Sequence, residues 1–134
     1  MSKVESVREN MPDDKFLNKV KAIILDHLED DSFGVADLAH AMGLSRSQLF
    51  RKLKSISNHS ANQIIRNIRL EEALKLLQED RYTVSEVAFK VGFSSPSYFN
   101  KCFHDHYGYA PGEYQKIVPE KEASTEKPVK GKVN

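Results

Sequence analysis

Two stretches of this chain repeat one another: GVADLAHAMGLSRSQLFRKLKSISNHSANQII, which begins at Gly34, and TVSEVAFKVGFSSPSYFNKCFHDHYGYAPGEY, which begins at Thr83. Small, apolar and helix-capping residues recur at an offset of 49 residues as far as Ser45, which matches Ser94, and at an offset of 50 from Ser47 onward. The second copy therefore holds one extra residue, in its turn or at the start of its second helix. Self-similarity of this kind indicates a repeated structural unit.

Each copy has the pattern of a helix, a turn and a second helix. Gly43 and Gly92 are suited to the left-handed conformation that ends a helix. Ser45 opens a capping box at the start of the next helix in the first copy. In the second copy Ser95 and Pro96 have the types of an N-cap and a first helical residue. A short glycine-containing turn between two helices is typical of the helix-turn-helix motif.

Apolar residues at helical spacing predict three further helices. The first begins at Asp14 and ends around Asp30. The second follows a cap at Ser60 and runs to about Gln78, so that its roughly 19 residues span about 28 Å. The last begins at Pro111 and carries Tyr114 and Ile117 into the second repeat.

The sequence thus predicts an all-α fold of about seven helices, with two helix-turn-helix subdomains joined by a long central helix in a homeodomain-like tandem. The predicted segments are a flexible N-terminal arm at 1–13, the first subdomain at 14–59, the linker helix at 60–79, the second subdomain at 80–118 and a disordered tail at 119–134.

The charge of the chain is unevenly distributed. The net charge is only +1, and residues 1–31 hold five Lys and Arg against eight Asp and Glu. Residues 45–118 hold eleven Lys and Arg against seven Asp and Glu, and the stretch 45–57 holds four cations and no acid. A nearly neutral chain of this kind can still present a local basic face to nucleic acid.

Several classes of protein find no support in the sequence. No nucleophile with an adjacent base, glycine-rich phosphate loop or carboxylate pair is present, so we expect neither an enzyme nor a cofactor. Cys102, His104 and His106 do not predict a metal site, because helical residues two apart point to different sides. One cysteine and no run of about 20 apolar residues predict a cytoplasmic segment that makes no membrane contact itself. The alternative is that it forms the cytoplasmic part of a membrane-bound sensor.

Three motifs resemble the DNA-binding domain of AraC/XylS-type regulators. They are V-A-x-x-V-G-F-S-x-x-S-Y-F-x-K-x-F at 87–103, G-x-x-P-x-x-Y at 108–114 and R-L-x-x-A-x-x-L-L at 69–77. The phrase S-R-S-Q-L-F-R-K-L-K at 45–54 resembles the output domains of hybrid two-component sensors from gut-type bacteria. The resemblance implies a bacterial transcription regulator and the C-terminal piece of a longer protein, whose other domains supply dimerisation.

The chain departs from the family pattern at four positions. Lys101 and His104 stand where the family usually has Arg and Lys, Asn58 where it has Gly, and Ala110 where it often has Ser or Thr. Asn58 is still compatible with a left-handed conformation. Because the second unit carries less charge, we expect the first unit to contribute more of the affinity.

In the helix at 46–57, Leu49, Leu53 and Ile56 are expected in the core. The opposite face then presents Arg46, Ser47, Phe50, Arg51 and Lys54. Arg51 is central on this face, and arginine can form two parallel hydrogen bonds to guanine, so it is the first candidate for reading a base. Arg46, Lys52 and Lys54 are candidates for phosphate contacts. For Phe50 two hypotheses remain open: contact with a thymine methyl group, or packing against a neighbouring helix.

The corresponding face of the helix at 96–107 is made by Ser95, Ser97, Asn100, Lys101 and His104. Asn100 suits adenine, and Lys101 suits guanine or phosphate. Ser95 is explained equally well as a helix cap, which does not require DNA. Three aromatic residues of this helix are assigned mainly to the core: Tyr98, Phe99 and Phe103.

The favoured function is sequence-specific binding of double-stranded DNA, with the two helices in adjacent major grooves, which lie about 34 Å apart. RNA polymerase is a further expected partner. The alternative is a helical protein-interaction module, docking a polymerase subunit or a partner domain, in which DNA contact is secondary.

Overall fold

In the computed structural model, which describes residues 11–114, every regular element is helical. The helices are α2 (Asp13–Asp26), α3 (Val35–Met42), α4 (Arg46–Ser57), α5 (Ala61–Glu79), α6 (Val84–Lys90) and α7 (Pro96–Tyr107). Residues 111–114 form the first turn of one more helix. The predicted all-α class with about seven helices is confirmed. Most of the predicted arm, the whole predicted tail and Ile117 lie outside the described residues.

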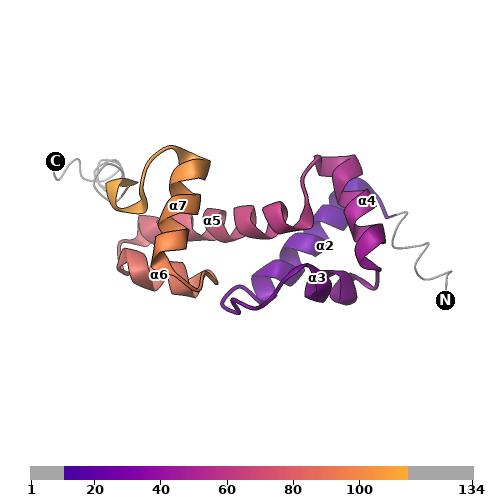
Figure 1. Cartoon of the computed structure of the whole chain (residues 1–134), viewed down its shortest axis with the longest axis horizontal. Helices are drawn as coiled ribbons and strands as arrows, with labels where there is room; N and C mark the ends of the chain where they lie inside the picture. The colour runs from indigo at the N-terminus through magenta and orange to yellow at the C-terminus, as the bar shows by residue number, and fades with distance from the viewer. Residues whose placement is uncertain (1–10, 115–134) are drawn as a thin grey trace. The chain divides into compact units, whose positions relative to one another are not determined.

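The chain divides into two compact units, Met1–Ile68 and Arg69–Asn134. Helices α2, α3 and α4 belong to the first unit, and α6 and α7 belong to the second (Figure 1). The boundary falls inside α5, so residues of this helix belong to both units. Its buried apolar residues are Ala61, Ile65 and Ile68 in the first unit and Leu70, Ala73 and Leu77 in the second.

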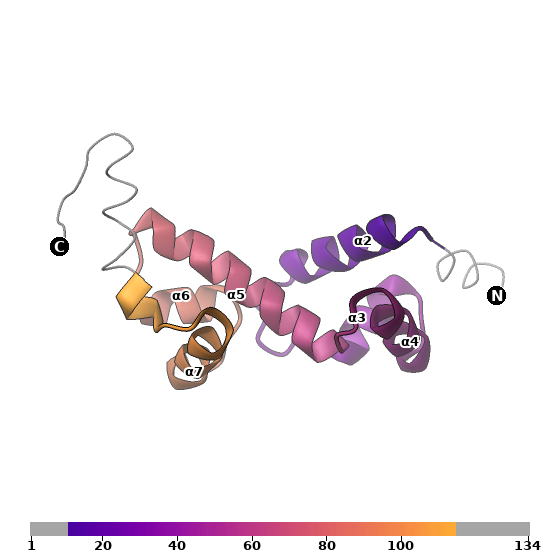
Figure 2. The same ribbon diagram turned by 90° about the horizontal axis from the view of Figure 1, so that it is seen from above.

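The first unit has a mainly aliphatic core, to which Phe16 and Phe33 add aromatic rings. Contacts join α3 to both α2 and α4, and the two views of the ribbon agree on this arrangement (Figure 2). Each helix gives the core the face on which its apolar residues recur every three or four positions. The fully buried side chains of these three helices are Phe16, Val20, Ile24, Leu38, Ala39, Met42, Leu49 and Leu53.

The second unit has a core rich in aromatic rings. Phe99 and Phe103 on α7 are completely buried, with ring centroids 5.7 Å apart, and Phe103 also lies 4.7 Å from Tyr107. The Tyr107 hydroxyl donates a hydrogen bond of 3.5 Å to the carbonyl oxygen of Leu70 on α5. Burial, followed by the charge of Glu71, raises the pKa of Tyr107 to about 12. The hydroxyl therefore remains protonated at neutral pH and ties the end of α7 to α5.

The two copies of the repeat form the same turn. Gly43 and Gly92 have positive φ angles of 75° and 91°. The residue after each glycine donates its backbone N–H back across the helix end: Leu44 to the Ala39 carbonyl at 3.0 Å, and Phe93 to the Ala88 carbonyl at 2.9 Å. This is the six-to-one bond of a Schellman motif, in which a left-handed residue satisfies carbonyls that the helix leaves open.

The extra residue of the second copy lies in its turn, at Ser94. Ser45 caps α4 by accepting a hydrogen bond from the Gln48 backbone N–H at 3.1 Å. Ser95 caps α7 in the same way, accepting from the Tyr98 N–H at 3.1 Å. The structural counterpart of Ser45 is therefore Ser95, and the predicted match of Ser45 with Ser94 was wrong. From the caps onward, positions in α7 correspond to positions in α4 with an offset of 50.

Helix α2 ends at Asp26, about four residues earlier than predicted. The His27 ring nitrogen Nδ1 lies 2.9 Å from the Ile23 carbonyl oxygen, and its ring stacks on Phe33 at 4.5 Å. The following backbone hydrogen bonds are of the tighter i to i+3 type, including that from Leu28 to Leu25. Leu28 is half-buried in this turn. The apolar pattern therefore continues beyond the last residue of the helix, which is why the sequence predicted a longer helix.

Arg69 is a buried charged residue that the sequence did not predict. Its side chain is 5% exposed, and Nη1 donates a hydrogen bond of 2.8 Å to the carbonyl oxygen of Val91, the C-cap of α6. A cation at a helix C-terminus satisfies an open carbonyl and interacts favourably with the helix dipole. Arg69 therefore fastens α6 to the second half of α5.

Candidate nucleic-acid interface

Helix α4 is held in place by its apolar face and its two ends. Leu49 and Leu53 are completely buried, and Ile56 is half-buried against the same core, as predicted. At the start, the Ser45 N–H donates to the Gln48 side-chain oxygen at 2.8 Å, which completes the predicted capping box. At the end, Asn58 takes the left-handed conformation with φ 61°. The buried face fixes which residues point outward.

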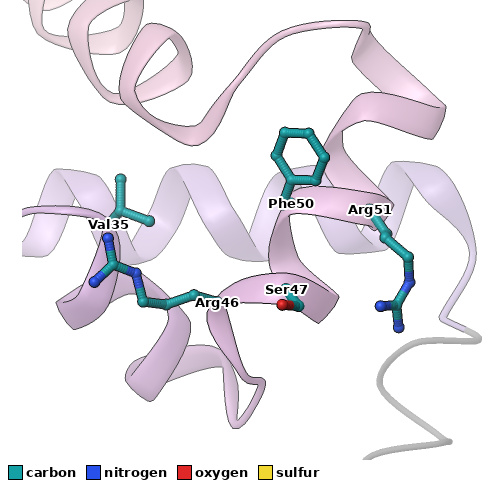
Figure 3. A pocket seen from close by; sticks show the side chains of 5 residues that line it. All are labelled: Val35, Arg46, Ser47, Phe50 and Arg51. Carbon is teal, nitrogen blue, oxygen red and sulfur yellow. The ribbon is translucent and has the colours of Figure 1, made fainter.

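The outward face of α4 borders an open hollow of about 450 Å³. Its lining consists of Val35 from the start of α3 and four residues of α4: Arg46, Ser47, Phe50 and Arg51 (Figure 3). Arg46 extends toward Val35, whereas Arg51 points away from it on the far side of Ser47. Two guanidinium groups thus flank a small hydroxyl residue on one exposed surface. The structure brings together four of the residues that the sequence had assigned to this face.

Phe50 is 53% exposed. This exposure agrees with the first of the two hypotheses, in which the ring is available to a ligand, and not with close packing against a neighbouring helix. An exposed phenyl ring beside two arginines offers an apolar contact of the kind that a thymine methyl group accepts.

Lys52 does not lie on the outward face. Its side chain is only 18% exposed, and Nζ lies 3.4 Å from the Met11 carbonyl oxygen and 3.5 Å from a carboxylate oxygen of Asp13. The same nitrogen lies 5.6 Å from the centre of the Phe16 ring. The expectation that Lys52 is available for a phosphate is corrected: its ammonium group fastens α4 to the start of α2. Lys54, by contrast, is exposed.

Helix α7 presents the corresponding face in the second unit. Ser97, Asn100, Lys101 and His104 are exposed, on the side opposite to Phe99 and Phe103. Ser95 is half-buried and serves as the N-cap, which supports the structural explanation of this residue.

Lys101 on this face has an acidic neighbour that the sequence reasoning missed. Its Nζ lies 3.1 Å from a carboxylate oxygen of Asp105, one helical turn further on. The hydrogen bond to Asp105, and then the charge of Asp105, raise the pKa of Lys101. The signal was present in the sequence, since residues four apart on a helix are neighbours.

Tyr98 was assigned to the core, and this assignment was wrong. The ring is 50% exposed, and its centroid lies 5.9 Å from that of the buried Phe93 ring. Phe99 and Phe103 are buried as predicted. Tyr98 therefore adds an aromatic ring to the exposed flank of α7, beside Lys101.

Residues 11–114 hold neither a metal site nor a membrane-spanning helix. Within this range no cluster of three or more His, Cys, Asp or Glu residues is arranged to hold a metal ion. Cys102 is buried, whereas His104 and His106 are exposed. Over the same range no helix is both long enough and apolar enough to cross a bilayer.

Comparison with known proteins places this arrangement in a family. A family model described as "Helix-turn-helix domain" matches residues 38–117. The histidine kinase P4 of Formosa agariphila is 35% identical over 108 residues, which cover 81% of this chain and 8% of that protein. The HTH-type transcriptional regulator MtrA of Neisseria gonorrhoeae is 35% identical over 103 residues, 77% of this chain and 34% of the regulator. The chain thus spans about a third or less of these two relatives.

A solved structure shows the same fold with its ligand. The DNA-binding domain of the global transcriptional factor AdpA, in complex with a target DNA, superposes with a TM-score of 0.71 at 30% identity. The match covers 78% of this chain and 94% of that domain. With its repeated helix-turn-helix units and the matched family model, the chain belongs to the AraC-type helix-turn-helix family.

Proposed function

We propose that this chain binds double-stranded DNA with sequence preference, as the DNA-binding part of a transcription regulator, and that α4 and α7 are its recognition helices. The observation that carries the proposal is the outward face of α4, where Arg46, Ser47, Phe50 and Arg51 line one open hollow. The AdpA domain, which was solved on its target DNA, gives independent support.

The side chains of α4 suit a major groove. Its buried face leaves Arg51 on the exposed side, and an arginine there is able to pair with the O6 and N7 atoms of guanine. Arg46 at the first helical position and Lys54 near the end are suited to phosphates on either side. We assign Lys52 no DNA contact, because its ammonium group is held by Met11 and Asp13.

The side chains of α7 offer fewer charges to DNA. Asn100 is exposed, and its side-chain amide can both donate and accept a hydrogen bond, as pairing with adenine requires. Lys101 supplies a cation, and Ser97 and His104 lie on the same exposed face. We propose that α4 contributes the larger share of the binding free energy.

A mobility-shift measurement on a duplex selected from a randomised pool tests the role of α4. The change Arg51→Ala is expected to raise Kd about tenfold or more, because a bidentate arginine–guanine contact contributes about 1–3 kcal/mol of discrimination. The matched control is Arg81→Ala, which removes the same charge from an exposed arginine that is paired with Glu79 outside both faces. Equal losses in the two variants would show that only net charge matters, and no loss in Arg51→Ala would remove this residue from the interface.

We further propose that the chain acts within a longer cytoplasmic protein. Its similarity to 8% of the histidine kinase P4 and to 34% of MtrA supports this proposal, because in both relatives the matching segment is a minor part of the whole. In such a protein the other domains would receive the signal and pair the subunits. A contact with RNA polymerase would be made by this segment together with those domains. Purification of the full protein and measurement of its oligomeric state and kinase activity test this arrangement.

A further inference from the structure

The two recognition helices have different residues at the position one helical turn after their central cation. With the offset of 50 set by the caps Ser45 and Ser95, Lys101 of α7 corresponds to Arg51 of α4. Four residues after each cation, α7 has Asp105 whereas α4 has Ser55. Only α7 therefore has an acidic residue at this position. Asp105 is exposed and lies next to the proposed DNA-facing side chains.

Asp105 and Lys101 form an ion pair at the surface. Nζ and the carboxylate oxygen are 3.1 Å apart, and the two side chains are 70% and 64% exposed. The helix geometry favours the contact, because residues four apart lie on the same side of a helix. A lysine in such a pair must exchange a carboxylate for a phosphate or a base edge when DNA arrives, and the carboxylate then lies close to a polyanion.

We propose that Asp105 is an affinity-limiting residue of the second recognition helix, which acts by holding the Lys101 ammonium group and so weakens the contact of α7 with DNA. The proposal rests on the function proposed above. It names a residue that makes the contribution of α7 to DNA affinity smaller than that of α4: the carboxylate of Asp105 competes with DNA for the ammonium group of Lys101. The hydrogen bond to Asp105 also raises the pKa of Lys101.

The test is the change Asp105→Asn, measured on the whole chain with the selected duplex over a range of salt concentrations. We expect Kd to fall about threefold to tenfold at low salt, and the slope of log K against log salt to steepen by about 0.9, the value of one more phosphate contact. The mirror change, Ser55→Asp in α4, is expected to weaken binding, because it places an acid four residues after Arg51. Circular dichroism and urea unfolding check that each variant keeps the fold.

Two controls separate a local from a general effect of charge. Asp26→Asn removes one acid from the exposed end of α2 and is expected to leave Kd within about twofold of the parent. In a Lys101→Ala background, Asp105→Asn is expected to bring a much smaller gain, because the group that it releases is missing and only the repulsion between the carboxylate and DNA is relieved. An equally large gain in that background, or an equal gain from Asp26→Asn, would overturn the proposal.

Failure of this proposal and failure of the proposed function give different results. If the parent chain does not bind any selected duplex, the DNA-binding function itself is wrong. If the parent binds and Arg51→Ala weakens it, but Asp105→Asn binds as the parent does, only the role of Asp105 is wrong.

Discussion

Two lysines only two positions apart on α4 have different surroundings. Lys52 is half-buried and paired with Asp13 and the Met11 carbonyl, whereas Lys54 is exposed. The sequence could not separate them, because helical spacing gives the direction of a side chain but not the group to which a long side chain returns. Helix α4 therefore presents three cationic side chains to DNA, although its sequence contains four.

This difference predicts separate effects of the two lysines on the salt dependence of DNA binding. Lys54→Met is expected to reduce the slope of log K against log salt by about 0.9, since it removes a phosphate contact. Lys52→Met is expected to leave that slope unchanged and to lower stability instead, because it removes a partly buried ion pair. Binding isotherms at several salt concentrations, together with urea unfolding, measure both. Equally reduced slopes for the two variants would mean that Lys52 also contacts a phosphate.

Two more residues show what could not be predicted at this scale. Arg69 is buried and bonded to Val91, although arginine is among the residues least often buried. Tyr98 is half exposed, although it sits among aromatic residues that are in the core. Arg69 bonds to a residue outside its own helix, and Tyr98 lies against Phe93 in the turn before α7, so a pattern within one helix carries no information about either contact.

At the scale of the helices, the ends were the best predicted features. The capping boxes at Ser45 and Ser60 and the glycine turns are all present, since each depends on residues within about four positions of one another. The end of α2 was missed because its stop is made by the His27 ring and a tighter turn, not by a glycine or proline.

Ser95 allows the capping and DNA-binding explanations to be separated. Its hydroxyl accepts the Tyr98 N–H, so Ser95→Ala is expected to lower the free energy of unfolding by about 1 kcal/mol. Ser95→Asn is expected to restore most of that stability, because asparagine is an equally good N-cap. Urea unfolding of the three proteins measures this. Full stability in Ser95→Ala would mean that the cap contributes little and that another role maintains the serine.

At the scale of the molecule, the repeat was the decisive signal. It predicted two helix-turn-helix units, and both are present with matching turns around Gly43 and Gly92. The sequence did not show that α5 is divided between two cores, because its apolar residues recur around the helix without a break. The charge inequality of the two units was visible in the sequence, and the structure adds the ion pair between Lys101 and Asp105.

Two recognition helices in one chain predict a fixed spacing between two half-sites. We expect the selected DNA to contain two preferred segments about 10–10.5 base pairs apart, one helical turn. Insertion of about five base pairs between them turns one half-site to the other side of the duplex. Simultaneous binding is then lost, and Kd is expected to rise about tenfold or more. An affinity that does not depend on the insertion would mean that a single helix accounts for recognition.

The most direct test of the central claim is a competition measurement with the parent chain at near-physiological salt. Its complex with the labelled selected duplex is challenged with the same unlabelled duplex or with one of scrambled sequence. Sequence-specific binding predicts that the selected competitor is effective at a concentration lower by about a thousandfold or more. Equal competition by both duplexes, with a steep dependence on salt, would contradict the claim and leave only binding to the phosphate backbone.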